Sequence, residues 1–369
     1  MRWVLLLVAL LISYGSLYPF NFHWHALSWR EMLLPGSFHL TNLSDQVVNV
    51  LLFLPYGFLL GWERDSRHRN RIFGLVFGLL LAHTLQVLQI FLPTRIATTA
   101  DTLFNWLGIG GGLMLGVVLG HPTWRTTTQR YVFATPLLLF LAWLIGRLFP
   151  FVPDFSWHNI ESSIAPVLNT KHFHWKPFII DSVSWLVAIY LLSEITKQRL
   201  DWVKAILFVC AVFFLEVLAA GNVITINNLI AAILAITLWT GVRHSRVEVT
   251  VAPLVMLSIL ALGILPFHWL GYAKAFHWLP FGMFLSGSSW ANVVHILESC
   301  FLLGGAIYVI YRLGFSWFVS SCFVISSLVL LEILQLYLAT HRPDISEPLL
   351  ALVLALLFPK LDERSIRVG

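Results

Sequence analysis

The chain has 369 residues, of which 58% are hydrophobic and only 11% are charged. Soluble globular proteins carry about 25% charged residues, so the composition excludes a soluble fold with an ordinary water-exposed surface. The formal net charge of +5 does not indicate a nucleic-acid partner, because the basic residues gather in loops between apolar segments. We therefore predict an all-α, polytopic helical membrane protein.

Apolar segments of membrane-spanning length recur along the whole chain. A helix needs about 20 mainly apolar residues to cross a bilayer, and twelve segments are close to this length. The predicted spans are residues 3–20, 47–62, 72–92, 101–120, 131–149, 178–195, 202–220, 225–241, 250–266, 290–311, 314–338 and 344–359. The first resembles a signal peptide, but we interpret it as a retained helix because the segments at 131–149 and 250–266 correspond to it.

The basic residues predict the orientation of these spans. With the N-terminus in the cytoplasm, sixteen lysines and arginines fall on the cytoplasmic side and seven on the outer side. This distribution follows the positive-inside rule, and it predicts that both termini are cytoplasmic. The basic run at residues 63–71 is then an anchor at the inner face of the membrane.

Internal similarity divides the twelve predicted spans into three tandem units. Similar aromatic motifs begin at Leu17, Leu148 and Ile264, each directly after an apolar span. A constant offset of 246 residues aligns Gln86 with Glu332, Gln89 with Gln335, and Asp101 with Glu347. We predict four-helix units at residues 1–124, 125–246 and 247–369, of which the second is the most degenerate.

Polar side chains gather at the ends of the spans that are predicted to face outward. Gln86 and Gln89 are three residues apart, and Asp101 and Asn105 are four apart, so each pair shares one helix face. Ionisable groups at membrane depth are costly and usually face the interior of a helix bundle. The candidate binding cluster is Asp45, Asn49, Gln86, Gln89, Arg95, Asp101, Asn105, Glu332, Gln335, Arg342 and Glu347.

Two interpretations of Arg95 and Asp101 stay open on the residues alone. Arg95 lies in the short turn between the third and fourth spans, close enough to pair with Asp101 and clamp the helix hairpin. An acid in the first turn of a helix also complements the helix dipole. Alternatively, the guanidinium of Arg95 binds an anionic headgroup, which it can contact through two hydrogen bonds at once.

Other patterns indicate packing rather than chemistry. Gly108, Gly112, Gly116 and Gly120 recur every four residues, which predicts a smooth face for close helix packing. The histidines of segments 23–25 and 172–174 have no acid or cysteine at metal-binding spacing, so we predict no metal site. We also predict no cofactor, because the sequence contains no nucleotide-binding motif.

The first unit resembles the VanZ-like family of bacterial membrane proteins, which is named for a teicoplanin-resistance accessory protein. The resemblance lies in the segments "LYPF" (17–20), "NVLLFLPYGFLLG" (49–61) and "LQVLQIFLPTRIATTADTLFNWLGIGGG" (85–112). The family pattern is matched at Asn49, Phe53, Pro55, Gly57, Gln89, Arg95, Asp101, Asn105 and Gly108. One departure is Gln86, which stands where the family has a glutamate. The resemblance implies a multi-pass protein of the bacterial inner membrane that acts in the cell envelope.

Three functions are compatible with these observations. The first is binding of an anionic lipid, a lipid-linked glycan headgroup or a glycopeptide-related ligand at the outer leaflet. The second is an enzyme on a lipid-linked envelope precursor, with Asp101 or Glu332 as the general base. The third is a transporter of a small solute, although the predicted repeats are parallel whereas many transporters use inverted ones. The sequence alone leaves open whether the protein is an enzyme.

Overall fold

The computed structural model describes residues 2–36, 43–62, 68–120, 134–149, 151–168, 173–282 and 289–366. These residues form helices and connecting loops, with isolated β-bridges and no strand. Seven of the described helices are long and apolar enough to cross a membrane. The prediction of an all-α polytopic membrane protein is thereby confirmed.

Each of the twelve predicted spans coincides with one long helix. These helices are α1 (Arg2–Leu17), α3 (Leu43–Trp62), α4 (His68–Gln89), α5 (Thr99–Gly120), α6 (Ala134–Leu148), α8 (Trp175–Thr196), α9 (Trp202–Leu218), α10 (Ile226–Val242), α11 (Val247–Ile264), α12 (Ser289–Arg312), α13 (Trp317–Gln335) and α14 (Ser346–Ile366). Seven of them, α3, α4, α5, α8, α11, α12 and α13, contain the segments that meet the length and hydropathy of a span. That the other five also cross the membrane stays a prediction.

Three short helices lie in loops where no span is predicted: α2 (Trp29–Leu33), α7 (Trp157–Ile164) and the 3-10 helix η2 (Ala165–Leu168). Helix α2 begins with a capping box, in which the Ser28 hydroxyl accepts from the Glu31 backbone and the Glu31 carboxylate accepts from the Ser28 backbone. This reciprocal pair satisfies backbone donors that would otherwise lack partners at a helix start. The Ser28 hydrogen bonds also lower the pKa of Glu31.

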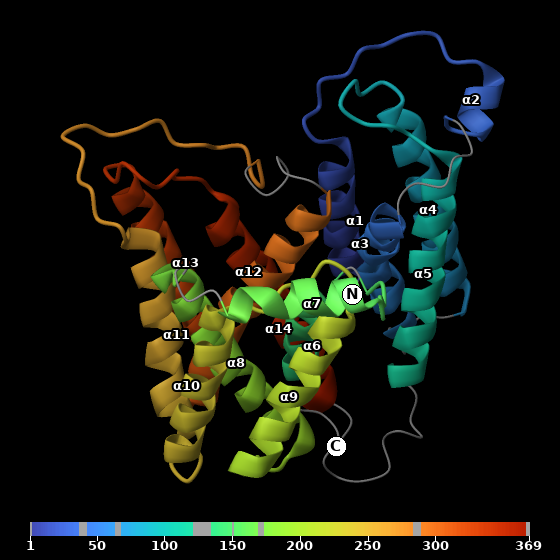
Figure 1. Ribbon diagram of the computed structural model, residues 1–369. Helices are drawn as coiled ribbons and strands as arrows, with labels where there is room; N and C mark the ends of the chain where they lie inside the picture. The colour runs from blue at the N-terminus through green and yellow to red at the C-terminus, as the bar shows by residue number, and fades with distance from the viewer. Residues whose placement is uncertain are drawn as a thin grey trace. The chain divides into compact units, whose positions relative to one another are not determined.

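The chain forms two compact units (Figure 1). The first contains residues 1–128 and 285–292, and the second contains residues 129–284 and 293–369. Helices α1 to α5 therefore belong to the first unit, whose extent is close to that of the first predicted four-helix unit. The second and third predicted units fall within one compact body, and the division of that body into two repeats stays a prediction.

The core of the first compact unit is an apolar layer contributed by four helices. Ala9 and Ile12 from α1, Phe53 and Tyr56 from α3, Ala82 and Leu85 from α4, and Ile109 from α5 pack together and are buried. Burial of such side chains stabilises a helix bundle through close packing. This layer determines which face each of the four helices turns toward the others. It therefore also determines which residues of different helices lie close together one helical turn away.

Helices α3 and α5 run alongside each other at unusually close range (Figure 1). A Cβ atom on Gly108 would lie 2.3 Å from the Val50 carbonyl oxygen, and one on Gly112 would lie 2.2 Å from that of Leu54. Gly116 meets the Phe58 carbonyl oxygen in the same way, at 2.2 Å. The packing role predicted for this glycine stripe is confirmed at these three positions, while the fourth, Gly120, lies at the end of the described segment.

In the second compact unit, α8 is the central helix. It contacts α6, α10 and α11, and a continuous stretch from Ser182 to Leu191 is buried. Trp185 and Tyr190 are among the largest fully buried side chains. The near absence of an exposed face explains why α8 is apolar on all sides, as expected for a helix surrounded by others.

Backbone hydrogen bonds join two segments of the chain at three corresponding places. The backbone N–H of His23 donates to Phe91 O at 2.7 Å, that of Asp154 to Leu218 O at 2.9 Å, and that of Leu270 to Tyr337 O at 2.7 Å. In each case the loop after the first helix of a predicted unit is bonded to the turn after its third helix. A tandem repeat of four-helix units predicts such a correspondence.

Candidate functional site at the α4–α5 turn

Asp101 occupies the first turn of α5 and is 7% exposed. Its backbone N–H donates to the Thr98 hydroxyl at 3.0 Å, a typical cap at a helix start. Its carboxylate Oδ1 accepts a hydrogen bond from Asn49 Nδ2 of α3 at 2.7 Å. This short bond to a charged acceptor joins the ends of two helices that already pack closely.

Gln89 and Arg95 are both bonded to the C-terminal end of α1. Gln89 Nε2 donates to Ser16 O at 2.9 Å, and Arg95 Nη2 donates to Gly15 O at 3.4 Å. The last carbonyl groups of a helix have no partner within the helix, and a positive charge there is favourable for the helix dipole. The two side chains thus satisfy the end of α1, and burial of the Arg95 guanidinium lowers its pKa.

The ion pairs of the described residues do not include one between Arg95 and Asp101. The hairpin clamp, one of the two interpretations that the sequence leaves open, is therefore not formed as an ion pair between these two residues. Asp101 is instead bonded to Asn49 of α3, and Arg95 to Gly15 of α1.

Three further polar side chains of this region are deeply buried. Gln86 is 3% exposed, Thr102 is 3% exposed and Asn105 is 2% exposed. Gln86 Oε1, Thr102 Oγ1 and Asn105 Oδ1 have no hydrogen-bond partner among the described residues. Gln86 and Asn105 were predicted from the sequence as members of the cluster, whereas Thr102 was not, although it follows Asp101 directly. Asp45, one turn before Asn49 in α3, is only partly buried.

The remaining predicted residues, Glu332, Gln335, Arg342 and Glu347, lie in the second compact unit. Gln335 Nε2 donates to Gly263 O at 3.1 Å. Glu332 Oε2 accepts from the Asp344 backbone at 2.8 Å and is buried. Glu347 is partly buried at the start of α14, and Arg342 is exposed. The cluster proposed from the sequence is thus divided between two compact units.

The second compact unit also contains a buried ion-pair cluster that was not predicted from the sequence. Arg147 of α6 pairs with Glu216 of α9, and its Nη1 lies 3.4 Å from Asp181 Oδ1 of α8. The guanidinium also lies 4.6 Å from the ring centroid of Trp185, a cation–π distance. An arginine near the end of an apolar span, with two acids at the ends of later spans, is a signal that could have identified this cluster.

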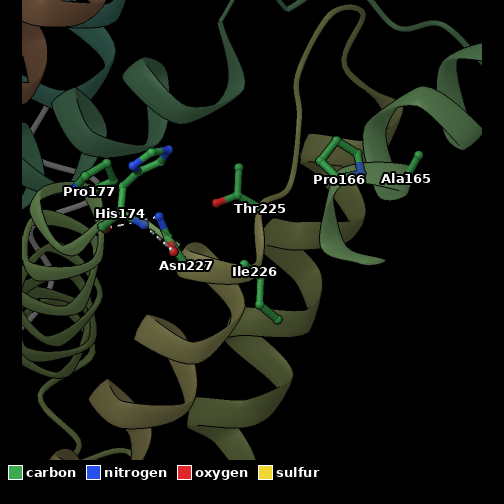
Figure 2. Close-up of a pocket in the computed structure, with 7 residues that line it drawn as sticks. All are labelled: Ala165, Pro166, His174, Pro177, Thr225, Ile226 and Asn227. Carbon is green, nitrogen blue, oxygen red and sulfur yellow. Dashed lines mark hydrogen bonds between the residues drawn. The ribbon is translucent and has the colours of Figure 1, made fainter. Parts of the chain in front are cut away.

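A separate cavity of about 550 Å³ opens beside η2 and the starts of α8 and α10 (Figure 2). Its wall is mainly apolar and is formed by Ala165, Pro166, His174, Pro177, Thr225, Ile226 and Asn227. The Asn227 amide exchanges two hydrogen bonds with the backbone of His174, as the dashed lines show. The cavity contains none of the predicted site residues and no acidic side chain.

No group of three or more histidine, cysteine or acidic side chains in the described ranges is arranged to hold a metal ion. Cys210, Cys300 and Cys322 are unpaired. The polar groups at the α4–α5 turn are one carboxylate, one guanidinium and several amides and hydroxyls.

These features define the class of the protein as a polytopic helical membrane protein with a polar layer at one end of its N-terminal helix bundle. Residues 3–120 match the model of the VanZ/LLP1 family. The chain is also 26% identical over 136 residues to Protein VanZ of Enterococcus faecium, a match that covers 37% of this chain and 80% of that protein. Residues 3–120 are thus similar to the VanZ-like family, and this match lies within the first compact unit. No solved structure matches it.

Proposed function

We propose that the chain acts in the bacterial cell envelope by binding an anionic lipid or a lipid-linked glycan headgroup at the outer leaflet. Arg95 is the residue that carries this proposal. Its guanidinium forms no ion pair with an acid of the described residues, and its Nη2 donates to the Gly15 carbonyl at the long distance of 3.4 Å. A charge that is partly desolvated and not neutralised is available for an anionic ligand.

The surroundings of Arg95 are suited to a lipid headgroup. The turn itself is exposed beside Arg95, where Ile96 is 86% exposed. The loop between α1 and α3 presents exposed Trp24 and Trp29, and tryptophan is enriched where a membrane meets water. An arginine in such a place can bind the two oxygens of a phosphate at once, in a medium where charges interact more strongly than in bulk water.

The nearby carboxylate of Asp101 would repel an anion, but this carboxylate is already stabilised by other groups. It is bonded to Asn49 and lies in the first turn of α5, where the helix dipole favours it. The same bond gives Asp101 a partner that joins two helices, which favours a structural role over the alternative of an enzyme that uses Asp101 as a general base. Glu332 is similarly engaged by the Asp344 backbone. No contact of the described residues favours a transport path over binding.

The proposal is tested by replacing Arg95 and measuring bound lipid. The full-length protein is placed in nanodiscs of phosphatidylcholine with increasing phosphatidylglycerol, and retained lipid is counted by native mass spectrometry. We expect Arg95→Gln to lose about tenfold in preference for phosphatidylglycerol, which corresponds to a hydrogen-bonded charge contact of about 1.4 kcal/mol. Arg30→Gln is the matched control, because Arg30 is an exposed arginine of α2 in the same unit. Equal phosphatidylglycerol preference in the wild type and Arg95→Gln would refute the role of Arg95.

A further inference from the structure

The interior of the first compact unit contains a group of buried oxygen atoms that the headgroup site does not use. We name Gln86, Thr102 and Asn105 the acceptor layer. Each of the three side chains is at least 97% buried, and the Oε1, Oγ1 and Oδ1 atoms, respectively, have no hydrogen-bond partner among the described residues. Buried polar atoms are satisfied in the great majority of cases, so three unsatisfied acceptors in one small region require an explanation.

The helix register places these side chains together. Ala82 and Ile109 pack in the same core layer. Gln86 follows Ala82 by four residues, and Asn105 and Thr102 precede Ile109 by four and seven. Residues at these spacings lie on one face of a helix, so all three side chains project from the faces that already meet in the core. The acceptor layer therefore stacks on the apolar core layer, toward the α4–α5 turn.

One negative charge lies at the edge of this layer. Asp101 precedes Thr102 directly and Asn105 by four residues, and it is 7% exposed. Asn49, which holds its carboxylate, lies four residues before Phe53 of the core layer. The acceptor layer and Asp101 thus form a water-poor site of oxygen atoms that carries one negative charge.

Two of the three corresponding positions of the third predicted unit have no side-chain oxygen atom. The 246-residue offset aligns Thr102 with Pro348 and Asn105 with Ala351. Gln86 aligns with Glu332, which already accepts a backbone hydrogen bond. Helices α13 and α14 pack against each other without acceptors at the positions of Thr102 and Asn105. Packing of these two helices therefore does not need these two oxygens, and their presence in the first unit points to a ligand.

We propose that the acceptor layer, together with Asp101, binds a monovalent metal cation, with Na⁺ as the best fit. The proposed ligand atoms are all oxygens, which hard cations prefer, and they include no nitrogen or sulfur that would favour zinc or copper. A single carboxylate balances one positive charge, whereas Ca²⁺ or Mg²⁺ would leave an excess charge in an apolar interior. The proposal does not depend on the headgroup role of Arg95.

The test compares the thermal unfolding of the purified full-length protein in NaCl, KCl and N-methylglucamine chloride at equal ionic strength. A ligand that binds only the folded state raises the melting temperature. We expect the wild type to melt about 5 °C higher in NaCl than in N-methylglucamine chloride at a Na⁺ concentration about 100 times its dissociation constant. Stabilisation by KCl alone would assign the site to K⁺ and would retain the monovalent-cation proposal.

The variant Thr102→Val distinguishes two roles of the Thr102 hydroxyl: a ligand of the cation, or a buried hydroxyl that only lacks a hydrogen-bond partner. Valine keeps the shape of threonine and removes the oxygen, so it relieves an unsatisfied acceptor in every salt. If Thr102 binds the cation, the variant loses at least half of the NaCl-dependent rise in melting temperature. Ser321→Ala is the matched control, because the Ser321 hydroxyl in α13 is also buried without a partner, and it should keep the full rise.

Direct binding of ²²Na⁺ to the wild type, measured by scintillation proximity, does not depend on whether a variant folds. Saturable binding that excess unlabelled NaCl displaces, and N-methylglucamine chloride does not, would support the site. Absence of ²²Na⁺ and K⁺ binding, together with equal melting temperatures in the three salts, would overturn the proposal. It would assign the three acceptors to ordered water, and would leave the proposed headgroup binding by Arg95 unaffected.

Discussion

At the scale of single residues, the most consequential feature of the second compact unit is the charge of Arg147. Two carboxylates, those of Asp181 and Glu216, surround it, and the three side chains are between 7% and 21% exposed. Removing one partner of a buried ion pair leaves an uncompensated charge, which is costly, whereas replacing every partner by neutral groups is often tolerated. The cluster therefore stabilises the packing of α6, α8 and α9 only when all three charged side chains are present.

This asymmetry leads to a prediction about Arg147→Met. We expect the substitution to lower the free energy of unfolding by about 3–5 kcal/mol, because Asp181 and Glu216 remain buried without a cation. Thermal unfolding of the purified protein, followed by fluorescence-detected size-exclusion chromatography, measures the effect. Adding Asp181→Asn and Glu216→Gln to Arg147→Met should recover most of the loss.

The matched control is the exposed pair of Asp201 and Lys204, whose Nζ and Oδ2 lie 3.6 Å apart. An exposed pair contributes about 0–1 kcal/mol, so Lys204→Met should leave the melting curve almost unchanged. If Arg147→Met melted like Lys204→Met, the cluster would not stabilise the fold as argued.

At the scale of secondary-structure elements, the contact between α3 and α5 allows a sharp comparison between neighbouring glycines. A Cβ atom on Gly112 would lie 2.2 Å from the Leu54 carbonyl oxygen, whereas one on Gly111 would meet nothing within 4 Å. The first contact is with backbone, which cannot rotate away as a side chain can. Two adjacent positions of one helix therefore differ entirely in what a methyl group would do.

We expect Gly112→Ala to separate α5 from α3 and to lower the free energy of unfolding by about 1–3 kcal/mol, as overpacking typically does. Gly111→Ala should instead be neutral or stabilising by up to about 1 kcal/mol, since alanine favours a helix over glycine. Melting temperatures of both variants in the same detergent provide the measurement. A loss of stability in Gly111→Ala equal to that in Gly112→Ala would contradict the close approach of the two helices.

Elements were predictable from the sequence where one local pattern determines them. Long apolar runs predicted the twelve long helices, and glycines every fourth residue predicted the close face of α5. Helix α2 was missed although Ser28 and Glu31 have the spacing of a capping box. The sequence could indicate that Arg147 has an acidic partner, but it could not specify the contacts of Asp101 and Arg147, because their partners lie 52, 34 and 69 residues away on other helices. Which faces of those helices meet depends on packing of the whole bundle.

At the scale of the whole molecule, we propose that the chain is a tandem array of three four-helix units, with parallel orientation and both termini in the cytoplasm. Three hydrogen bonds from side-chain amides to backbone carbonyls, which we call the amide clasps, support the repeat. Gln89 donates to Ser16 O, Asn222 to Arg147 O, and Gln335 to Gly263 O. In each clasp, a side chain from the end of a third helix or the turn after it satisfies the end of a first helix. An even number of spans per unit keeps the three units parallel, so the α4–α5 and α13–α14 turns would face the same side of the membrane.

The orientation predicts which positions react with a membrane-impermeant thiol reagent on intact cells. The starting protein has Cys210, Cys300 and Cys322 replaced by alanine, because two of these cysteines are exposed. Ile96→Cys in the α4–α5 turn should label from outside, since Ile96 is 86% exposed. Thr340→Cys in the α13–α14 turn should label equally, because Thr340 is exposed at the corresponding place of the third unit. Lys204→Cys at the start of α9 should label only after the membrane is permeabilised.

Each labelling outcome has a separate meaning for the whole molecule. External labelling of Lys204→Cys with protection of Ile96→Cys would invert the topology and would place Arg95 in the cytoplasm, where an outer-leaflet headgroup cannot reach it. Labelling of Ile96→Cys and Thr340→Cys from opposite sides would mean an odd number of crossings between them. Three parallel four-helix units would then be impossible. In a chain with twelve spans, eight long helices lie between the two turns (α5, α6, α8, α9, α10, α11, α12 and α13), and an even number of crossings places both turns on the same side.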